Sequence, residues 1–323
     1  MNKKVTLAKA VCALSALASA AVVSSAFAQS WPARPMRLIM PFAVGGPVDL
    51  VARTFSPKLA DRLGQPVIVE NRVGAGGNLA AEFILKSPPD GYQMLFVTTG
   101  LITNPFFLKG SPEPSQFAGV IQLVNTPFML VASNNLPPKT FPEIVSYIRA
   151  NPGKVSCASS GALPTVGCEL LRFHAKSDMI MVMYKGNGPA MQAVMSGEAN
   201  LLFDPANTAF TQVKAGRVRA IATPGQKRGL PGMPDLPAIS ETIPEFHFEG
   251  LQGIAVHPQT PKDIVSRLNR ELTAVMALSE VNDPLMKVGM QVQTGTPEAF
   301  EQKMKTDFER YGQVAKAAGI KPE

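Results

Sequence analysis

The chain has 323 residues, with 31 lysines and arginines against 24 aspartates and glutamates, and a formal net charge of +7. This excess is mild for the length, and the basic residues do not cluster with aromatic residues, which argues against nucleic acid as a partner. A mild positive field favours small anions instead. The length fits two domains of ordinary size.

The N-terminus has the pattern of a secretory signal peptide. Three lysines within the first nine residues precede an apolar stretch, and Ala26-Phe27-Ala28 is a small-x-small cleavage site. We therefore expect residues 1–28 to be removed after Ala28, leaving an exported, periplasmic chain of net charge +4. The alternative is an uncleaved membrane anchor, which two serines within the apolar run disfavour.

Strand-like and helix-like segments alternate through the first third of the mature chain. A strand over 37–42 leads into a helical pattern that ends at Gly64, where a left-handed C-cap is expected. A strand over 67–69, a helix over 79–86 and a strand over 94–97 follow. This βαβαβ order predicts a parallel sheet covered by helices.

The rest of the chain repeats the pattern and returns to its start. Two apolar segments, 120–132 and 246–256, are typical of crossovers between two α/β lobes. We expect lobe 1 to comprise 29–127 with 250–323, and lobe 2 to comprise 128–249. A ligand would then bind in the cleft between the lobes, at the carboxyl ends of the strands. Further strands are expected at 155–157, 179–182, 201–203, 218–222 and 252–256, and helices at 142–150, 166–176, 189–195, 205–214, 261–279 and 297–318.

The turn after the first strand is the strongest candidate for an anion site. An apolar strand runs into Gly-Gly-Pro, which opens a helix whose first N–H groups have no partner within the helix. An acidic residue in the first turn complements the helix dipole. The alternative is an ordinary, well-capped turn. The expected ligand contacts here are Phe42, Ala43, Val44, Gly45, Gly46 and Asp49.

Three other short segments follow predicted strands in the same way. Thr99 and Gly100 follow the strand at 94–97, and Asp204 follows the strand at 201–203. A solvated loop would equally explain the serines and glycine after the strand at 155–157, and an N-cap would explain the aspartate. Their shared position at strand ends is the reason to expect Ser159, Ser160, Gly161, Thr99, Gly100 and Asp204 at a ligand cleft.

Motifs for catalysis, metals and cofactors are missing from the sequence. There is no Gly-x-Ser-x-Gly elbow, and the three histidines, His174, His247 and His257, are isolated from one another. The glycine run at 74–77 lacks the third glycine of a dinucleotide fingerprint, because Leu79 occupies that position. We therefore expect no cofactor, no metal and no enzymatic activity, with a secreted α/β hydrolase as a remote alternative.

Two cysteines, Cys157 and Cys168, remain after removal of the signal peptide. In an oxidising compartment we expect them to form one disulfide that closes a short loop. Two free buried thiols are the alternative.

The motifs, taken in order, resemble the substrate-binding proteins of tripartite tricarboxylate transporters, the Bug or TctC family. The resemblance covers essentially the whole mature chain. It rests on residues 31–42, Gly45-Gly46-Pro47-Val48-Asp49, 63–72, 74–78, 89–92, Asn104-Pro105, Tyr184-Lys185-Gly186, Phe203-Asp204, 214–216 and 318–323.

The resemblance implies a type 2 periplasmic-binding-protein fold, in which two α/β lobes joined by two crossover strands close around a small carboxylate. It implies that the first-lobe loop holds one carboxylate, partly through water, and that Ser159-Ser160-Gly161 engages the other end of the ligand. Asn104 joins the expected contacts through its motif. The segments Thr99-Gly100-Leu101 and 162–168 depart from the family pattern, so the identity of the acid is not implied.

The expected function is therefore that of a monomeric solute receptor that delivers a small carboxylate to a membrane permease, with no catalytic step. A periplasmic sensor that feeds a signalling partner is the alternative from another class, and no residue pattern separates the two.

Overall fold

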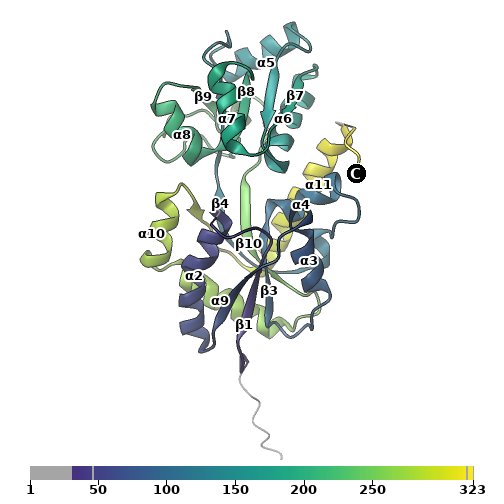
Figure 1. Ribbon diagram of the computed structural model, residues 1–323, viewed down its shortest axis with the longest axis vertical. Helices are drawn as coiled ribbons and strands as arrows, with labels where there is room; N and C mark the ends of the chain where they lie inside the picture. Colours follow the sequence, from purple (N-terminus) through teal and green to yellow (C-terminus); the bar gives the residue numbers. More distant parts are fainter. Residues whose placement is uncertain (1–30, 46, 318, 323) are drawn as a thin grey trace, which may run out of the picture.

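Two separate β-sheets organise the chain, one in each of two lobes stacked along the long axis of the molecule (Figure 1). The computed structural model describes residues 31–45, 47–317 and 319–322. The expected signal peptide with its cleavage after Ala28, and the expected ligand contact Gly46, lie outside the described residues.

The sheet of the lower lobe has six strands within the described residues. In sheet order the strands are β11 (Gln291–Val292), β4 (Ala118–Thr126), β10 (Gly250–Val256), β3 (Gln93–Thr98), β1 (Met36–Met40) and β2 (Val67–Asn71). The strand β1 pairs in parallel with β2 and β3, as the βαβαβ pattern predicts, and β10 runs antiparallel between β3 and β4.

Helices cover both faces of this sheet, which is why β1 reads as a nearly continuous apolar run. Leu38 packs in the cluster of one face and Ile39 in the cluster of the other, since successive side chains of a strand point to opposite faces. One face carries α2 (Pro47–Leu63), α9 (Lys262–Met276) and α10 (Ser279–Lys287), and the other carries α3 (Asn78–Leu85), α4 (Thr99–Phe107) and α11 (Pro297–Ala317).

The upper lobe repeats this arrangement with five strands among the described residues. Its sheet order is β7 (Ile180–Met183), β6 (Ser156–Ser159), β8 (Leu201–Pro205), β5 (Phe128–Ala132) and β9 (Arg219–Ala222). The helices α5 (Phe141–Ala150) and α6 (Ala162–Ala175) cover one face, and α7 (Asn187–Ser196) and α8 (Ala206–Lys214) cover the other.

The chain passes between the lobes at two neighbouring points. It leaves the lower sheet at the end of β4, passes Pro127 and enters β5; it returns through Glu249 into β10. Because β4 and β10 pair with each other, the two crossings lie side by side. We keep 29–127 with 250–323, and 128–249, as the proposed lobes, since these boundaries fall at the two crossings.

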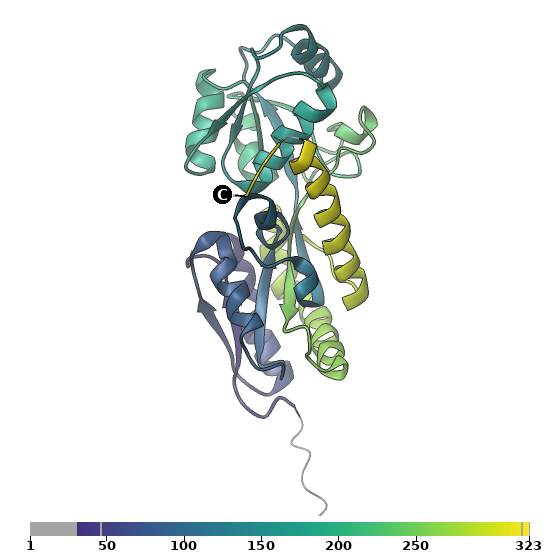
Figure 2. The same cartoon turned by 90° about the vertical axis from the view of Figure 1, so that its right-hand side faces the viewer.

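A single long helix, α11, extends beside both lobes (Figure 2). It packs against β4 and α4 in the lower lobe and against α6 in the upper lobe. Phe300, Tyr311 and Leu170 belong to one buried cluster that continues from one lobe to the other. The lobes are therefore joined by apolar packing as well as by two strands.

Two helices were not expected from the sequence. The helix α4 is buried on nearly all sides, so the segment shows no amphipathic period from which a helix can be predicted. The helix α10 was not expected either, because the helix predicted at 261–279 ends where α10 begins; only Ala277 and Leu278 separate α10 from α9. No helix in the described ranges combines the length and apolar character needed to cross a bilayer.

The expected disulfide is confirmed. Cys157 in β6 is bonded to Cys168 in α6, with an S–S distance of 2.02 Å and a Cα–Cα distance of 6.0 Å. The bond joins the first half of α6 to β6 in the sheet beneath it. Its two cysteines flank the segment Ser159-Ser160-Gly161 in the sequence.

The packing of α6 on its sheet can be tested at Gly167. A Cβ at this position would lie 2.7 Å from ring atoms of both Phe203 and Phe248. Gly167→Ala should lower the free energy of unfolding by about 1–3 kcal/mol, measured by urea denaturation, because the rings must move. Gly188→Ala in α7 is the matched control. Its Cβ would have nothing within 4 Å, so it should gain about 0.5–1 kcal/mol from helix propensity.

Candidate ligand-binding site

The expected site residues lie where β1, β3, β6 and β8 end and where α2, α4, α6 and α8 begin. The strands β1 and β3 run in the same direction, from the foot of the lower lobe towards the upper lobe (Figure 1). Across the gap, α4 of the lower lobe packs against α6 of the upper lobe. Helix N-termini from both lobes, each with unpaired N–H groups, therefore lie on the sides of the lobes that face each other.

The loop after β1 is held by its own internal contacts. The Gly45 N–H donates to Asp49 Oδ2 at 3.0 Å, and Asn71 Nδ2 donates to the Phe42 carbonyl at 2.7 Å. The Gly45 donor is thus occupied, contrary to the expectation that it is free for a ligand. The N–H groups of Ala43 and Val44 make no hydrogen bond within the described residues, and both side chains are exposed.

Asp49 is a fixed acceptor beneath this loop. Its side chain is 4% exposed, and Oδ2 accepts hydrogen bonds from Gly45 and from Arg53 Nε at 2.8 Å. The Arg53 guanidinium holds the pKa of the carboxyl below its usual value, against the opposing effect of burial. Its second oxygen, Oδ1, has no partner in the described part of the chain, so it can accept from a ligand or water.

The start of α4 is attached to the crossover strand. Thr99 Oγ1 accepts from the Leu251 N–H at 2.8 Å, which joins this helix to β10. Asn104 Nδ2 donates to the Gly76 carbonyl at 3.0 Å and to Asn78 Oδ1 at 2.9 Å. Both side chains therefore hold elements of the lower lobe together, a role that reasoning from sequence missed. Gly100, between them, is partly exposed.

The two serines of the upper lobe differ in their surroundings. Ser159 is fully buried, and its Oγ lies 2.5 Å from Thr165 Oγ1 and donates to the Gly161 carbonyl at 3.2 Å. Ser160 Oγ is also buried but has no partner within the described residues. Gly161 is the N-cap of α6 and supplies no side-chain cap. At the start of α6, the serine hydroxyl that has no partner among the described residues is therefore that of Ser160.

Asp204 is buried, with 1% of its side chain exposed. The N-cap of α8 is Pro205, so the expected alternative of an aspartate N-cap is wrong; Asp204 Oδ2 instead accepts from Thr208 Oγ1. Burial raises the pKa of Asp204 to about 6. Its Oδ1 has no partner among the described residues, as at Asp49.

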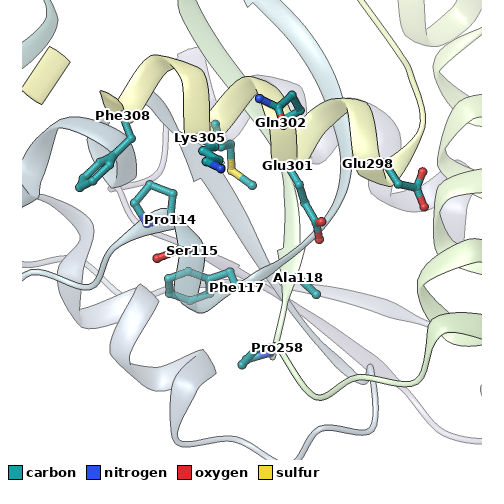
Figure 3. A pocket seen from close by; sticks show the side chains of 11 residues that line it. Pro114, Ser115, Phe117, Ala118, Pro258, Glu298, Glu301, Gln302, Lys305 and Phe308 are labelled. Carbon is teal, nitrogen blue, oxygen red and sulfur yellow. The ribbon is translucent and has the colours of Figure 1, made fainter. Parts of the chain in front are cut away.

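A groove of about 590 Å³ lies between α11 and the segment 114–118 (Figure 3). Its wall combines apolar side chains, such as Phe117 and Phe308, with Glu298 and Glu301. None of the expected site residues lines it, and its carboxylates disfavour an anion. In the described ranges no group of three or more histidine, cysteine or acidic side chains can hold a metal ion.

The pKa of Asp204 predicts a pH-dependent stability. The Asp204 carboxyl binds its proton more tightly in the folded protein than in the unfolded chain. Its protonation therefore contributes fully to the free energy of unfolding below about pH 4, and this contribution is lost as the pH rises through about 6. Asp204→Asn can keep the bond from Thr208. It should raise the free energy of unfolding at pH 7 by about 3 kcal/mol and flatten the change of that free energy between pH 4 and 6. Urea denaturation across this range checks the prediction, with the exposed Asp283→Asn as matched control. An unchanged profile would contradict it.

Comparisons with known proteins agree with this geometry. The model of the "Tripartite tricarboxylate transporter family receptor" matches residues 51–320. A "UPF0065 protein in tcbD-tcbE intergenic region" from a Pseudomonas species is 31% identical over 307 residues, covering 92% of this chain and 91% of the relative.

Two solved structures extend the likeness to the fold. The R. palustris structure with adipate has a TM-score of 0.73 and 27% identity, and covers 91% of this chain and 100% of that chain. MatC from Rhodopseudomonas palustris, with bound malate, has a TM-score of 0.71 and 30% identity, and covers 88% of this chain and 100% of that chain. The family consists of solute-binding receptors, not enzymes, and the two-lobe fold is the periplasmic-binding-protein fold that the sequence resemblance implied. With a match across most of its length and this shared architecture, the chain belongs to the family of tripartite tricarboxylate transporter receptors.

Proposed function

We propose that this protein is a periplasmic receptor that binds a small dicarboxylate between its two lobes and delivers it to a membrane permease. The observation that carries the proposal is the buried, unpartnered hydroxyl of Ser160 at the start of α6. A buried hydroxyl without a partner is costly unless a ligand or water satisfies it. Family membership makes a transport ligand the natural partner, and the two solved relatives hold adipate and malate.

The upper lobe would hold one carboxylate through Ser160 and the start of α6. This helix has 14 residues, so its N-terminus carries unpaired N–H groups and a positive partial charge that favour an anion. Gly161 has no side chain that could cover these donors. Ser159 supports them indirectly, because its hydroxyl is bonded to Thr165 in the first turn of the helix.

The lower lobe would hold the other carboxylate through the loop after β1. Its proposed donors are the N–H groups of Ala43, Val44 and Gly46, with Phe42 and Gly100 beside them. Asp49 Oδ1 and Asp204 Oδ1 are acceptors and would repel a carboxylate at close range. We assign them instead to a ligand hydroxyl or to a bridging water, which is consistent with recognition that is partly water-mediated.

Donors in both lobes make lobe closure the expected mechanism. An open form can satisfy only one end of a dicarboxylate, so the ligand favours the closed form by the bonds made at the second end. A shift from 1:99 to 99:1 takes about 5.5 kcal/mol. Two or more ionic hydrogen bonds, at about 1.5–3 kcal/mol each, can supply it.

We further propose export by the N-terminal signal peptide, cleavage after Ala28 and action as a monomer. A membrane permease is the proposed partner, because the matching family is named for a tripartite transporter.

The proposal predicts which acids stabilise the protein. In a thermal-shift and calorimetric screen of mono-, di- and tricarboxylates, at least one dicarboxylate should bind. Held at a hundred times its Kd, it should add about 2.7 kcal/mol to the free energy of unfolding. Stabilisation by none of the acids, or chemical conversion of an acid, would contradict the proposed receptor.

A second prediction separates the two serines. Ser160→Ala should weaken binding of that dicarboxylate about tenfold or more, because one hydrogen bond to a charged group is lost. Its stability without ligand should stay near wild type, since Ser160 Oγ has no partner in the described chain. Ser159→Ala should instead lower stability. Ser115→Ala, exposed in the lower lobe, is the matched control. If Ser160→Ala binds as tightly as wild type, the upper-lobe contact is wrong.

A further inference from the structure

A second cavity, of about 860 Å³, lies at the junction of the two lobes. Both crossings contribute to its wall, through Pro127 on one side and Glu249 on the other. The upper lobe adds the loop after β9, including Lys227, and the lower lobe adds Lys303 and Arg310 of α11. A ligand bound in this cavity would therefore contact both lobes beside the two crossings, which we call the hinge.

This cavity is separate from the proposed carboxylate site. It lies at the β11–β4 edge of the lower sheet, whereas the carboxylate site lies beyond the ends of β1 and β3, further across the same sheet. No proposed carboxylate contact lines it.

The charges of the cavity leave an excess of cations. Lys303 Nζ donates to Asp307 Oδ2 at 3.2 Å, and Arg310 donates to Asp307 Oδ1, so one carboxylate is shared by two cations. Both cationic groups are therefore within hydrogen-bond distance of the same carboxylate and close enough for one anion to reach both. Lys227 is exposed and has no ion pair in the described part of the chain.

The remaining titratable groups do not remove this excess. The lining holds three cations, Lys227, Lys303 and Arg310, against two carboxylates, Glu249 and Asp307. Burial raises the pKa of Glu249, and Asn125 Nδ2 donates to its Oε2 at 2.6 Å. His247 stands in contact with Arg310, and burial together with Arg310 and Lys303 lowers its pKa to about 3. It is thus a neutral acceptor. Arg310 Nε is buried and has no partner within the described residues, so a guanidinium donor remains unused.

We propose that this cavity binds a small tetrahedral oxyanion of the sulfate or phosphate class. The anion would bridge Lys227 of the upper lobe to Lys303 and Arg310 of the lower lobe. A tetrahedral ion has oxygens that point in several directions, so it can accept hydrogen bonds from donors in both lobes at once. A planar monocarboxylate has only two oxygens, so it can bridge these donors less well. Such an ion would favour the angle between the lobes at which both sets of cations reach it, and would thereby act on ligand binding at the other site.

The test uses the mature protein without any carboxylate. Sodium sulfate and sodium phosphate are titrated by calorimetry and by NMR shifts, with sodium chloride added to keep the ionic strength constant. Lys227→Gln and Lys303→Gln should each weaken sulfate binding about tenfold, because each removes a charged donor. Lys214→Gln in α8 and Lys305→Gln in α11, both exposed and outside the cavity, are the matched controls and should bind as wild type.

Bridging has its own signature in solution. Sulfate should change the radius of gyration of the wild-type protein in small-angle scattering. The single substitution Lys227→Gln should abolish that change, because it removes the cation of the upper lobe. Equal binding by all four variants, acetate binding as tightly as sulfate, or binding with no change in scattering would each overturn the proposal. Since no dicarboxylate is present, none of these outcomes affects the proposed carboxylate site.

Discussion

The antiparallel pairing of β4 with β10 is the constraint on which the rest of the structure depends. Both strands are almost wholly buried, and each leads directly to a crossing between the lobes. Gly253 in β10 lies so close to the Phe300 ring of α11 that a Cβ there would overlap it. The pair therefore holds the two crossings side by side and seats α11 against them, at the boundary that the two lobes share.

The proposed carboxylate site is coupled to this pair on the lower side. The bond from the Leu251 N–H to Thr99 Oγ1 attaches the start of α4 to β10, and α4 in turn packs against α6. On the upper side, the Cys157–Cys168 disulfide holds α6 to its sheet around Ser160. A ligand between the lobes would thus act on groups whose positions are set by rigid elements, which reduces the conformational entropy lost on binding.

Polar contacts around Asn125 also join the two crossings between the lobes. Asn125, near the end of β4, donates to Glu249 Oε2 at 2.6 Å and to Gln293 Oε1 at 2.5 Å, so one amide joins both crossings to the residue that follows the edge strand β11. Its carbonyl oxygen accepts from Gln122. In a buried position such an amide is stable only with its partners in place. The network gives the hinge a defined geometry, next to the cavity that we propose for an oxyanion.

The sequence by itself determined the two-lobe fold, most elements and the strand ends at which a ligand is expected, because these follow from local periodicity, glycine and proline. It also determined the disulfide, since Cys157 and Cys168 are the two cysteines that follow the expected signal peptide. It did not determine α4, whose burial on nearly all sides removes the helical period, or the roles of Thr99 and Asn104, whose partners are distant in sequence. Ser159 and Ser160 are neighbours of identical chemistry, and only the tertiary structure decided which hydroxyl is free, because Thr165 reaches one and not the other. The hinge cavity was equally beyond the sequence, since its cations converge only when the lobes are assembled.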